Sequence, residues 1–270
     1  MQGLAWKEPD FNRPGSDKYC IEEFSAGIPL RMPKMILFDY GQTLINQAKF
    51  NGVRGTQAVL RYATRNKYNR TASQIQAEAE AINRELGRAD HSTRHQFQVE
   101  VPNHMFTSYL YASQGIELSI DADTVDRVFW DAASPGEATK GIGEFLQYLA
   151  GKGIRTGVVS NLAFSGKALR ERIQSCIPDH SFEYILATSE YLYRKPNRRI
   201  FELALEMADL SPEEVWYVGD DYECDIAGAS NAGIFPVWYL GAIDMEYELR
   251  EGILTIMNWG ELKGVLEKAG

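Results

Sequence analysis

An α/β fold built on a doubly wound parallel sheet is predicted by the way apolar runs and helical segments alternate along this chain. Short apolar runs have the pattern of strands buried on both faces, at residues 35–38, 154–159, 184–187, 215–218 and 234–238. Segments with helical spacing, such as Ile142, Phe145 and Leu149, lie between them. Polar residues follow four of these runs, and open parallel sheets bind ligands at the carboxyl ends of their strands.

Three regions are predicted along the chain. Residues 1–33 are broken by proline and glycine but carry several apolar side chains, which indicates an N-terminal strap packed on the body. Residues 34–47 and 134–270 form a Rossmann-like core in which strands alternate with helices. Residues 48–133 form a helical insertion with a small β-flap at its start.

Local signals predict the flap and a helix of the insertion. Asn51-Gly52 is typical of a two-residue hairpin turn. Ser73 and Gln76 have the spacing of a helix capping box, and Gly87 is placed to end the helix. The predicted apolar face of that helix consists of Ile75, Ala79, Ile82 and Leu86.

The insertion differs in charge from the rest of the chain. Nine basic residues, among them Arg61 and Arg65, and five acidic ones lie between Lys49 and Leu110, although the whole chain has a net charge of −9. Such a concentration is typical of a solvated helical face, and the alternative is a region that receives an anionic substrate. The three histidines of the insertion, His91, His95 and His104, are expected in structural rather than catalytic positions.

Composition excludes several classes of protein. The 270 residues exceed the roughly 150 of one average domain, and 44% of them are hydrophobic, so a packed core and a second smaller domain are expected. Net negative charge disfavours nucleic acid and anionic membranes as partners. The three cysteines form no Cys-x-x-Cys pair, and no apolar run approaches the roughly 18 residues of a membrane span. We expect a cytoplasmic protein, and the oligomeric state stays open.

Polar residues at four strand ends predict a site. Asp39 ends the first strand, Ser160 and Asn161 end another, and Lys195 lies in the loop after the strand at 184–187. The strand at 215–218 is followed by an acidic group, Asp220, Asp221 and Asp225. Converging carboxylates repel one another unless a cation neutralises them, and a set of oxygen ligands selects Mg²⁺. A metal beside a lysine suits a phosphoryl group, and the nearby acid is either a nucleophile or a ligand.

Four ordered motifs resemble those of the haloacid dehalogenase-like (HAD) hydrolase superfamily. They are Phe38-Asp-Tyr-Gly-Gln-Thr-Leu44, Val158-Val-Ser-Asn161, Arg194-Lys-Pro196 and Val218-Gly-Asp-Asp221, the last followed by Asp225. The resemblance covers the chain from about Met35 to the C-terminus. It implies a Rossmann-like core, and the insertion is similar to the helical cap of the first type (C1) in that superfamily.

The resemblance also implies roles for the site residues. Asp39 attacks phosphorus to form an aspartyl-phosphate, Ser160 hydrogen-bonds the transferred phosphoryl group, and Lys195 stabilises its charge. Asn161 contributes a backbone N–H to the substrate. The implied substrate is a small anionic, phosphorylated metabolite.

A magnesium ion is implied as the cofactor. Asp39 and Asp220 are the direct ligands in this resemblance, together with the backbone carbonyl of Gly41. Asp221 or Asp225 holds the ion through water or orients the lysine.

One position departs from the superfamily's pattern. HAD phosphatases usually carry a second Asp two residues after the nucleophile, as general acid and base, and here that position is Gly41. The first interpretation is a magnesium-dependent phosphatase acting on a good leaving group, with a histidine of the insertion or Tyr40 as a possible substitute base. The alternatives are a dehalogenase-type hydrolase that forms an ester on Asp39, and a phosphate- or metal-binding protein with vestigial catalysis.

Overall fold

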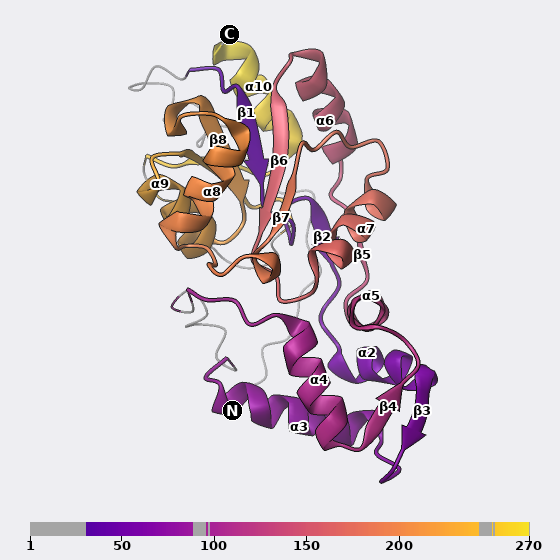
Figure 1. The fold of residues 1–270 in the computed structure, drawn as a ribbon. Coiled ribbons are helices and arrows are strands. Elements are labelled where there is room, and N and C mark those ends of the chain that lie inside the picture. The colour runs from indigo at the N-terminus through magenta and orange to yellow at the C-terminus, as the bar shows by residue number, and fades with distance from the viewer. Residues whose placement is uncertain (1–30, 89–95, 97, 243–249, 251, 270) are drawn as a thin grey trace, which may run out of the picture.

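A six-stranded sheet lies at the centre of the structure (Figure 1). The computed structural model describes residues 31–88, 96, 98–242, 250 and 252–269. The strand order is β10-β9-β8-β1-β6-β7 and every neighbouring pair is parallel. The strands are β1 (Met35–Phe38), β6 (Arg155–Ser160), β7 (Ile185–Ala187), β8 (Val215–Gly219), β9 (Phe235–Tyr239) and β10 (Leu254–Ile256). The predicted parallel sheet is therefore confirmed, and β10 is a strand that the sequence analysis did not predict.

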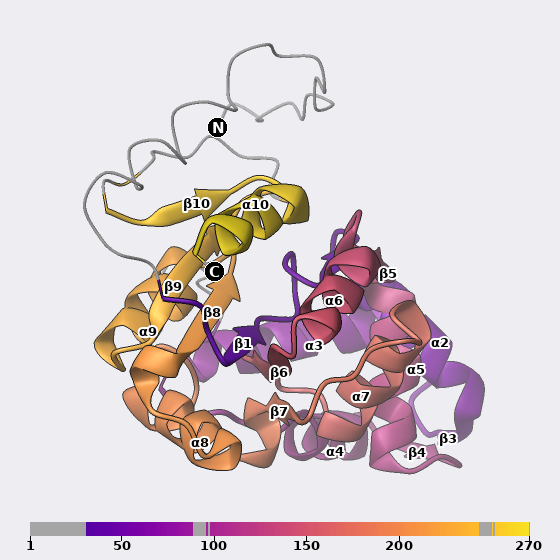
Figure 2. The same cartoon turned by 90° about the horizontal axis from the view of Figure 1, so that it is seen from above.

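Helices cover both faces of this sheet (Figure 2). One face carries α6 (Ile142–Gly151), α7 (Gly166–Cys176) and α10 (Trp259–Ala269), and the other carries α8 (Arg198–Ala208) and α9 (Gly228–Asn231). Side chains alternate along β1, because successive residues of a strand point to opposite faces. Ile36 and Phe38 join the core under α6 and α10, whereas Met35 and Leu37 pack under α8. Burial on both faces explains why the strand reads as a continuous apolar run.

The insert, which we define as residues 52–133, lies beyond the carboxyl ends of the strands of the sheet (Figure 1). Its elements are α2 (Gly52–Val59), the 3₁₀ turn η1 (Leu60–Tyr62), β3 (Ala63–Asn66), α3 (Ala72–Glu85), α4 (Asn103–Ser113), β4 (Ile116–Leu118) and α5 (Ala122–Ala133). These helices share a separate apolar cluster that includes Val59, Ile75, Leu110 and Val125. The antiparallel pair of β3 and β4 was not predicted.

The predicted hairpin turn at Asn51-Gly52 is wrong. The Asn51 side chain accepts a hydrogen bond from the backbone N–H of Arg54 at 3.0 Å, so it caps α2, and Gly52 is the first residue of that helix. A two-stranded ladder does lie beside this point. Its strands are β2 (Ile45–Gln47) and β5 (Gly136–Ala138), which come from the two chain segments that connect the insert to the core.

The predicted capping box lies two residues too late. Thr71 and Gln74 form the box at the start of α3, because Thr71 has an extended backbone while Ser73 is already helical. Gln76 instead donates a hydrogen bond to Thr56 Oγ1 at 2.6 Å and so ties α3 to α2. The predicted end of the helix is confirmed, since Gly87 has a φ of 69° directly after it.

Residues 1–30 of the predicted strap lie outside the described residues. Within the described part of the chain, no helix combines the length and the apolar character that crossing a bilayer requires.

Candidate functional site

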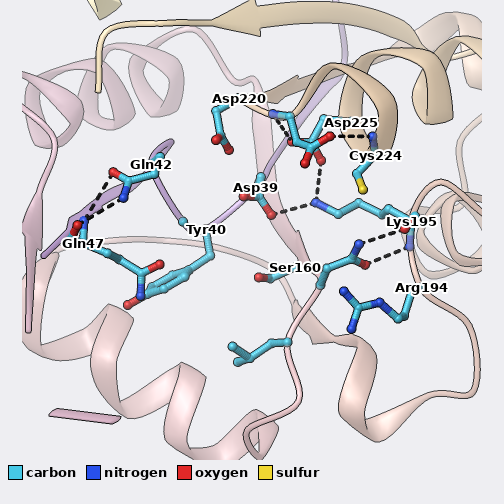
Figure 3. Close-up of a pocket in the computed structure, with 14 residues that line it drawn as sticks. Asp39, Tyr40, Gln42, Gln47, Ser160, Arg194, Lys195, Asp220, Cys224 and Asp225 are labelled. Carbon is cyan, nitrogen blue, oxygen red and sulfur yellow. Dashed lines mark hydrogen bonds and ion pairs between the residues drawn. The ribbon is translucent and has the colours of Figure 1, made fainter. Parts of the chain in front are cut away.

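A pocket opens where β1, β6 and β8 end (Figure 3). Its lining includes all eight residues that the sequence singled out: Asp39, Gly41, Ser160, Asn161, Lys195, Asp220, Asp221 and Asp225. Parallel strands present their carboxyl ends at one edge of the sheet, which explains why residues from distant parts of the chain meet here. Tyr40, Gln42, Gln47, Leu162, Arg194 and Cys224 complete the lining.

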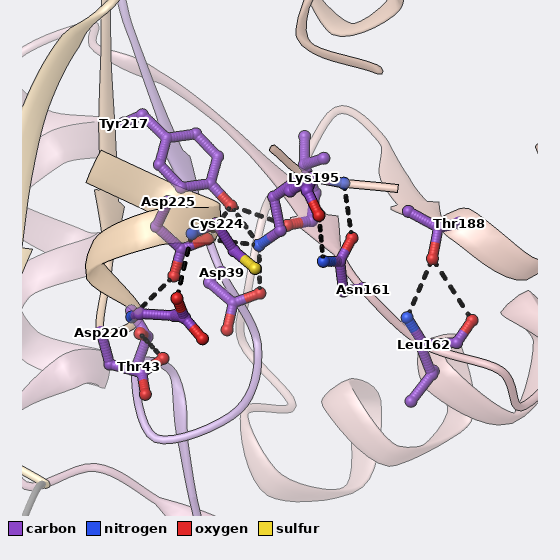
Figure 4. A network of polar contacts seen from close by, with 12 residues as sticks. Asp39, Thr43, Asn161, Leu162, Thr188, Lys195, Tyr217, Asp220, Cys224 and Asp225 are labelled. Carbon is purple, nitrogen blue, oxygen red and sulfur yellow. Dashed lines mark hydrogen bonds and ion pairs between the residues drawn. The ribbon is translucent and has the colours of Figure 1, made fainter. Parts of the chain in front are cut away.

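Lys195 lies at the centre of the buried polar network (Figure 4). Its ammonium donates hydrogen bonds to Asp39 Oδ1 at 2.7 Å, to Asp225 Oδ1 at 2.6 Å and to the Tyr217 hydroxyl at 2.7 Å. The Tyr217 hydroxyl in turn donates to the carbonyl of Val159 at 2.8 Å. These contacts hold the ammonium against one oxygen of Asp39.

The charge state of this lysine follows from its surroundings. Burial disfavours the ammonium form, but the carboxylates of Asp225 and Asp39 outweigh burial and hold the pKa of Lys195 well above its ordinary value. Burial also raises the pKa of Tyr217 well above its ordinary value, so its hydroxyl stays neutral. The two carboxylates therefore favour the ammonium form of Lys195.

Asn161 fixes the backbone beside Lys195. Its side-chain oxygen accepts from the N–H of Lys195 and its side-chain N–H donates to the carbonyl of the same residue, both at 2.8 Å. The resemblance implied only a backbone contact to substrate for Asn161. The structure adds a side-chain contact that places the lysine between the carboxylates.

The acidic residues make a strongly negative edge. Oxygen atoms of Asp39, Asp220 and Asp225 all lie within 4.8 Å of one another. Burial, and then the neighbouring charge of Asp39, raises the pKa of Asp220 well above its ordinary value. Lys195 provides one positive charge for three carboxylates, so a cation with oxygen ligands would relieve the remaining repulsion. The donor set suits Mg²⁺, which binds carboxylates and leaves room for water and phosphate.

Two of the predicted metal residues are engaged elsewhere. Asp225 accepts from Lys195 with one oxygen, and from the backbone N–H of Asp221 at 3.0 Å with the other. The Asp221 side chain accepts from the N–H of Cys224 at 2.9 Å, which caps the π-helical turn of Tyr222–Ala227. Asp39 accepts from Lys195 through Oδ1, and Asp220 accepts from the Thr43 hydroxyl through Oδ1 at 3.4 Å.

Gly41 leaves a space that another side chain fills. A Cβ placed on Gly41 would lie 2.8 Å from Oε1 of Gln47, the last residue of β2. The Tyr40 hydroxyl is no substitute base, because burial raises its pKa above the ordinary value of tyrosine and its ring packs on Trp130. His104 is exposed on α4 and outside the pocket lining, and the other two histidines of the insertion lie outside the described residues.

The insert reaches the site through Glu100, which the sequence analysis did not predict. The buried Glu100 carboxylate accepts from Arg194 at 2.7 and 2.8 Å and from the Thr188 hydroxyl at 2.8 Å. Its backbone N–H donates to the carbonyl of Leu192 at 3.1 Å. No local pattern in the sequence predicts this contact, because Glu100 and its partners lie more than 85 residues apart.

The basic residues of the insert do not line the described pocket. Arg61 and Arg65 are exposed on η1 and β3, and Arg65 pairs with Glu117 at 2.9 Å. Figure 1 places β3 at the end of the insert remote from the sheet. For these two arginines the structure favours a solvated face over a region that receives substrate.

Comparison with known proteins identifies the family. The chain is 31% identical over 130 residues to glyceraldehyde 3-phosphate phosphatase of Pyrococcus furiosus, covering 46% of this chain and 52% of that protein. It is 36% identical over 69 residues to phosphoserine phosphatase of Thermus thermophilus, covering 26% of this chain and 28% of that protein. The matched segments thus span about half or less of these curated relatives.

Solved structures show the same fold. The crystal structure of 2-haloacid dehalogenase from Pseudomonas syringae superposes with a TM-score of 0.60 at 20% identity, covering 88% of this chain and 100% of that one. A HAD phosphatase from Thermococcus onnurineus gives a TM-score of 0.58 at 18% identity, covering 86% and 97%. A family model described as haloacid dehalogenase-like hydrolase matches residues 33–233, which is most of the chain. The chain therefore belongs to the haloacid dehalogenase-like hydrolases.

Proposed function

We propose that this protein is a magnesium-dependent phosphatase of small phosphorylated metabolites that works through an aspartyl-phosphate on Asp39. The observation that carries the proposal is the contact between Asp39 and the buried ammonium of Lys195, 2.7 Å apart at the wall of the pocket. Relatives named as phosphatases of glyceraldehyde 3-phosphate and phosphoserine support a phosphate ester as substrate.

In the first step an oxygen of Asp39 attacks phosphorus and the substrate's oxygen leaves. Lys195 holds Oδ1 of Asp39, so the carboxylate is oriented before the substrate arrives. The hydroxyl of Ser160, at the end of β6, donates to a phosphoryl oxygen, and the positive charge of the Lys195 ammonium stabilises the negative charge that develops there. Asp225 keeps the ammonium in place.

The carboxylates of Asp39 and Asp220, with the backbone carbonyl of Gly41, are the groups that would hold Mg²⁺. The ion would neutralise negative charge on the phosphoryl group as it approaches these acids. Asp221, beside Asp220 at the pocket wall, would bind through water.

The glycine at position 41 narrows the substrate class. The usual acid that protonates the leaving oxygen is absent, and such a group contributes about a hundred- to ten-thousandfold to the rate. A leaving group that departs with little protonation, as in a sugar 1-phosphate or an acyl phosphate, avoids this loss. We therefore expect these classes to be the better substrates.

A phosphatase screen tests the proposal. Sugar, nucleotide and acyl phosphates are incubated with and without Mg²⁺, with Asp39→Asn as the matched control. Phosphate release that requires both the metal and Asp39 supports the proposal. Halide release from 2-haloacids without metal supports the dehalogenase alternative, and binding of phosphate or metal without turnover supports a protein with vestigial catalysis.

A further inference from the structure

The place of the missing acid is taken by a carboxamide. Oε1 of Gln47 lies 2.8 Å from the position of a Cβ on Gly41, so any side chain at position 41 would meet it. Gln47 lines the pocket together with Asp39 and Ser160, and its side chain reaches from β2 toward the loop that follows Asp39 (Figure 3). A polar group therefore stands where the chain lacks the usual carboxylate.

Backbone contacts hold Gln47 in this place. Gln42 Nε2 donates to the carbonyl of Gln47 at 3.1 Å, and the N–H of Gln47 donates to Gln42 Oε1 at 3.4 Å. On its other side Gln47 pairs with Gly136 in the ladder of β2 and β5. The loop from Asp39 to Gln47 is thus closed on itself, and the Gln47 carboxamide projects from a fixed backbone.

We propose that Gln47 positions the water that hydrolyses the aspartyl-phosphate, an inference that rests on the proposed function. Its Oε1 accepts a hydrogen bond from the water and aims the water oxygen at phosphorus. The new bond joins that oxygen to phosphorus, the bond from phosphorus to Asp39 breaks, and Asp39 leaves as a carboxylate. The water's proton passes to a phosphoryl oxygen and the product is dihydrogen phosphate, so no general base is needed.

The two neighbouring side chains are less suited to this role. The amide of Gln42 contacts the Gln47 backbone with both its oxygen and its nitrogen. The Tyr40 hydroxyl is buried, and its ring packs on Trp130 with centroids 5.3 Å apart. Gln47 is half-buried, so its carboxamide is open to water in the pocket.

Two variants isolate the role of the carboxamide. Gln47→Ala removes it, and Gly41→Ala displaces it, because the added methyl group would meet Oε1 at 2.8 Å without bringing an acid. The φ of Gly41 lies outside the left-handed region, so alanine adds no backbone strain there. Asn46→Ala is the matched control, since Asn46 is an exposed neighbour on the same strand and outside the pocket lining.

Rapid-quench kinetics with an aryl phosphate separate the two chemical steps. We expect Gln47→Ala and Gly41→Ala each to slow dephosphorylation between about 10- and 100-fold. The rate of the leaving-group burst should stay within about twofold in Gln47→Ala, and the double variant should dephosphorylate no more slowly than the worse single one. Gln47→Glu should restore the second step and add a rise of rate with pH, because a carboxylate can take the proton.

Two outcomes overturn the inference in different ways. If the wild type turns over and Gln47→Ala dephosphorylates at the same rate, the role of Gln47 is refuted but the proposed function is not. Losses of dephosphorylation rate that multiply in the double variant of Gln47→Ala and Gly41→Ala would refute the same role. Absence of any phosphoenzyme and of any phosphate release from the wild type would refute the proposed function and this role with it.

Discussion

Replacing Lys195 with methionine should destabilise the fold as well as the reaction. Methionine preserves most of the side-chain volume but removes the ammonium, which is 1% exposed and hydrogen-bonded to Asp39, Asp225 and Tyr217. Breaking a buried ion pair by deleting one partner costs about 3–5 kcal/mol, because the remaining charge stays buried and uncompensated. We expect the free energy of unfolding to fall by that amount near pH 8.

The loss should depend on pH in a defined direction. Burial already raises the pKa of Asp225 above its ordinary value, and removal of Lys195 raises it further. A carboxyl group with a raised pKa in the folded state binds a proton on folding, so its penalty is absent below the unfolded pKa, grows as pH rises above it and is complete above the folded pKa. The deficit of Lys195→Met should therefore be smaller at pH 5 than at pH 8.

Urea unfolding at both pH values, with a chelator present, measures this effect. Lys34→Met is the matched control, since Lys34 is exposed and pairs with Glu214 at the surface. Asp225→Asn added to Lys195→Met should recover part of the lost stability, because it removes one of the uncompensated charges. A deficit under about 1 kcal/mol at pH 8, or one that grows at pH 5, would show that the cluster does not depend on the lysine charge.

Three further variants test the site and the insert. Asp39→Asn should abolish turnover while leaving the fold intact, since Lys195 keeps Asp225 as a partner, and retention of more than a few per cent of activity would contradict the role of Asp39 as nucleophile. The wild type should release a burst of leaving group followed by a slow steady state, and a wild type without a burst would point to another base. Gly41→Asp should raise the slow steady-state rate if the Gln47 side chain moves aside. Neutralising Arg61 and Arg65 together should leave KM for active phosphates unchanged, since both lie outside the pocket lining, and a higher KM would restore the substrate-recruiting interpretation.

The sheet could be predicted from the sequence, because a buried strand appears as a continuous apolar run and polar residues follow it where it ends. Asp39 and Ser160 follow runs of apolar residues in β1 and β6, and the geometry of a parallel sheet brings such ends together. Asn51 shows the limit of local signals, because the same dipeptide serves a hairpin turn or a helix N-cap, and the neighbouring α2 decides between them.

Contacts between segments that are distant in the sequence could not be predicted in this way. Glu100 meets Arg194 only through the docking of the insert on the core, and Gln47 approaches Gly41 only because β2 folds back beside the loop. Tyr217 is one apolar-looking residue of β8 in the sequence, and its hydroxyl reaches Lys195 only in the folded sheet. Periodicity identifies buried positions but does not assign partners to them.

The central place of β1 has a consequence for synthesis of the protein. Its neighbours in the sheet are β6 and β8, so Met35 pairs with Arg155 on one side and with Val215 on the other. The helices of the insert contact one another over shorter stretches of chain than β1 and its two neighbours do, and contacts between residues closer in sequence form faster than more distant ones. On the ribosome the insert can pack while Asp39 still lacks Lys195 and Asp225, which emerge later. A chain released before residue 195 would carry Asp39, the proposed nucleophile, without the ammonium of Lys195 that orients it.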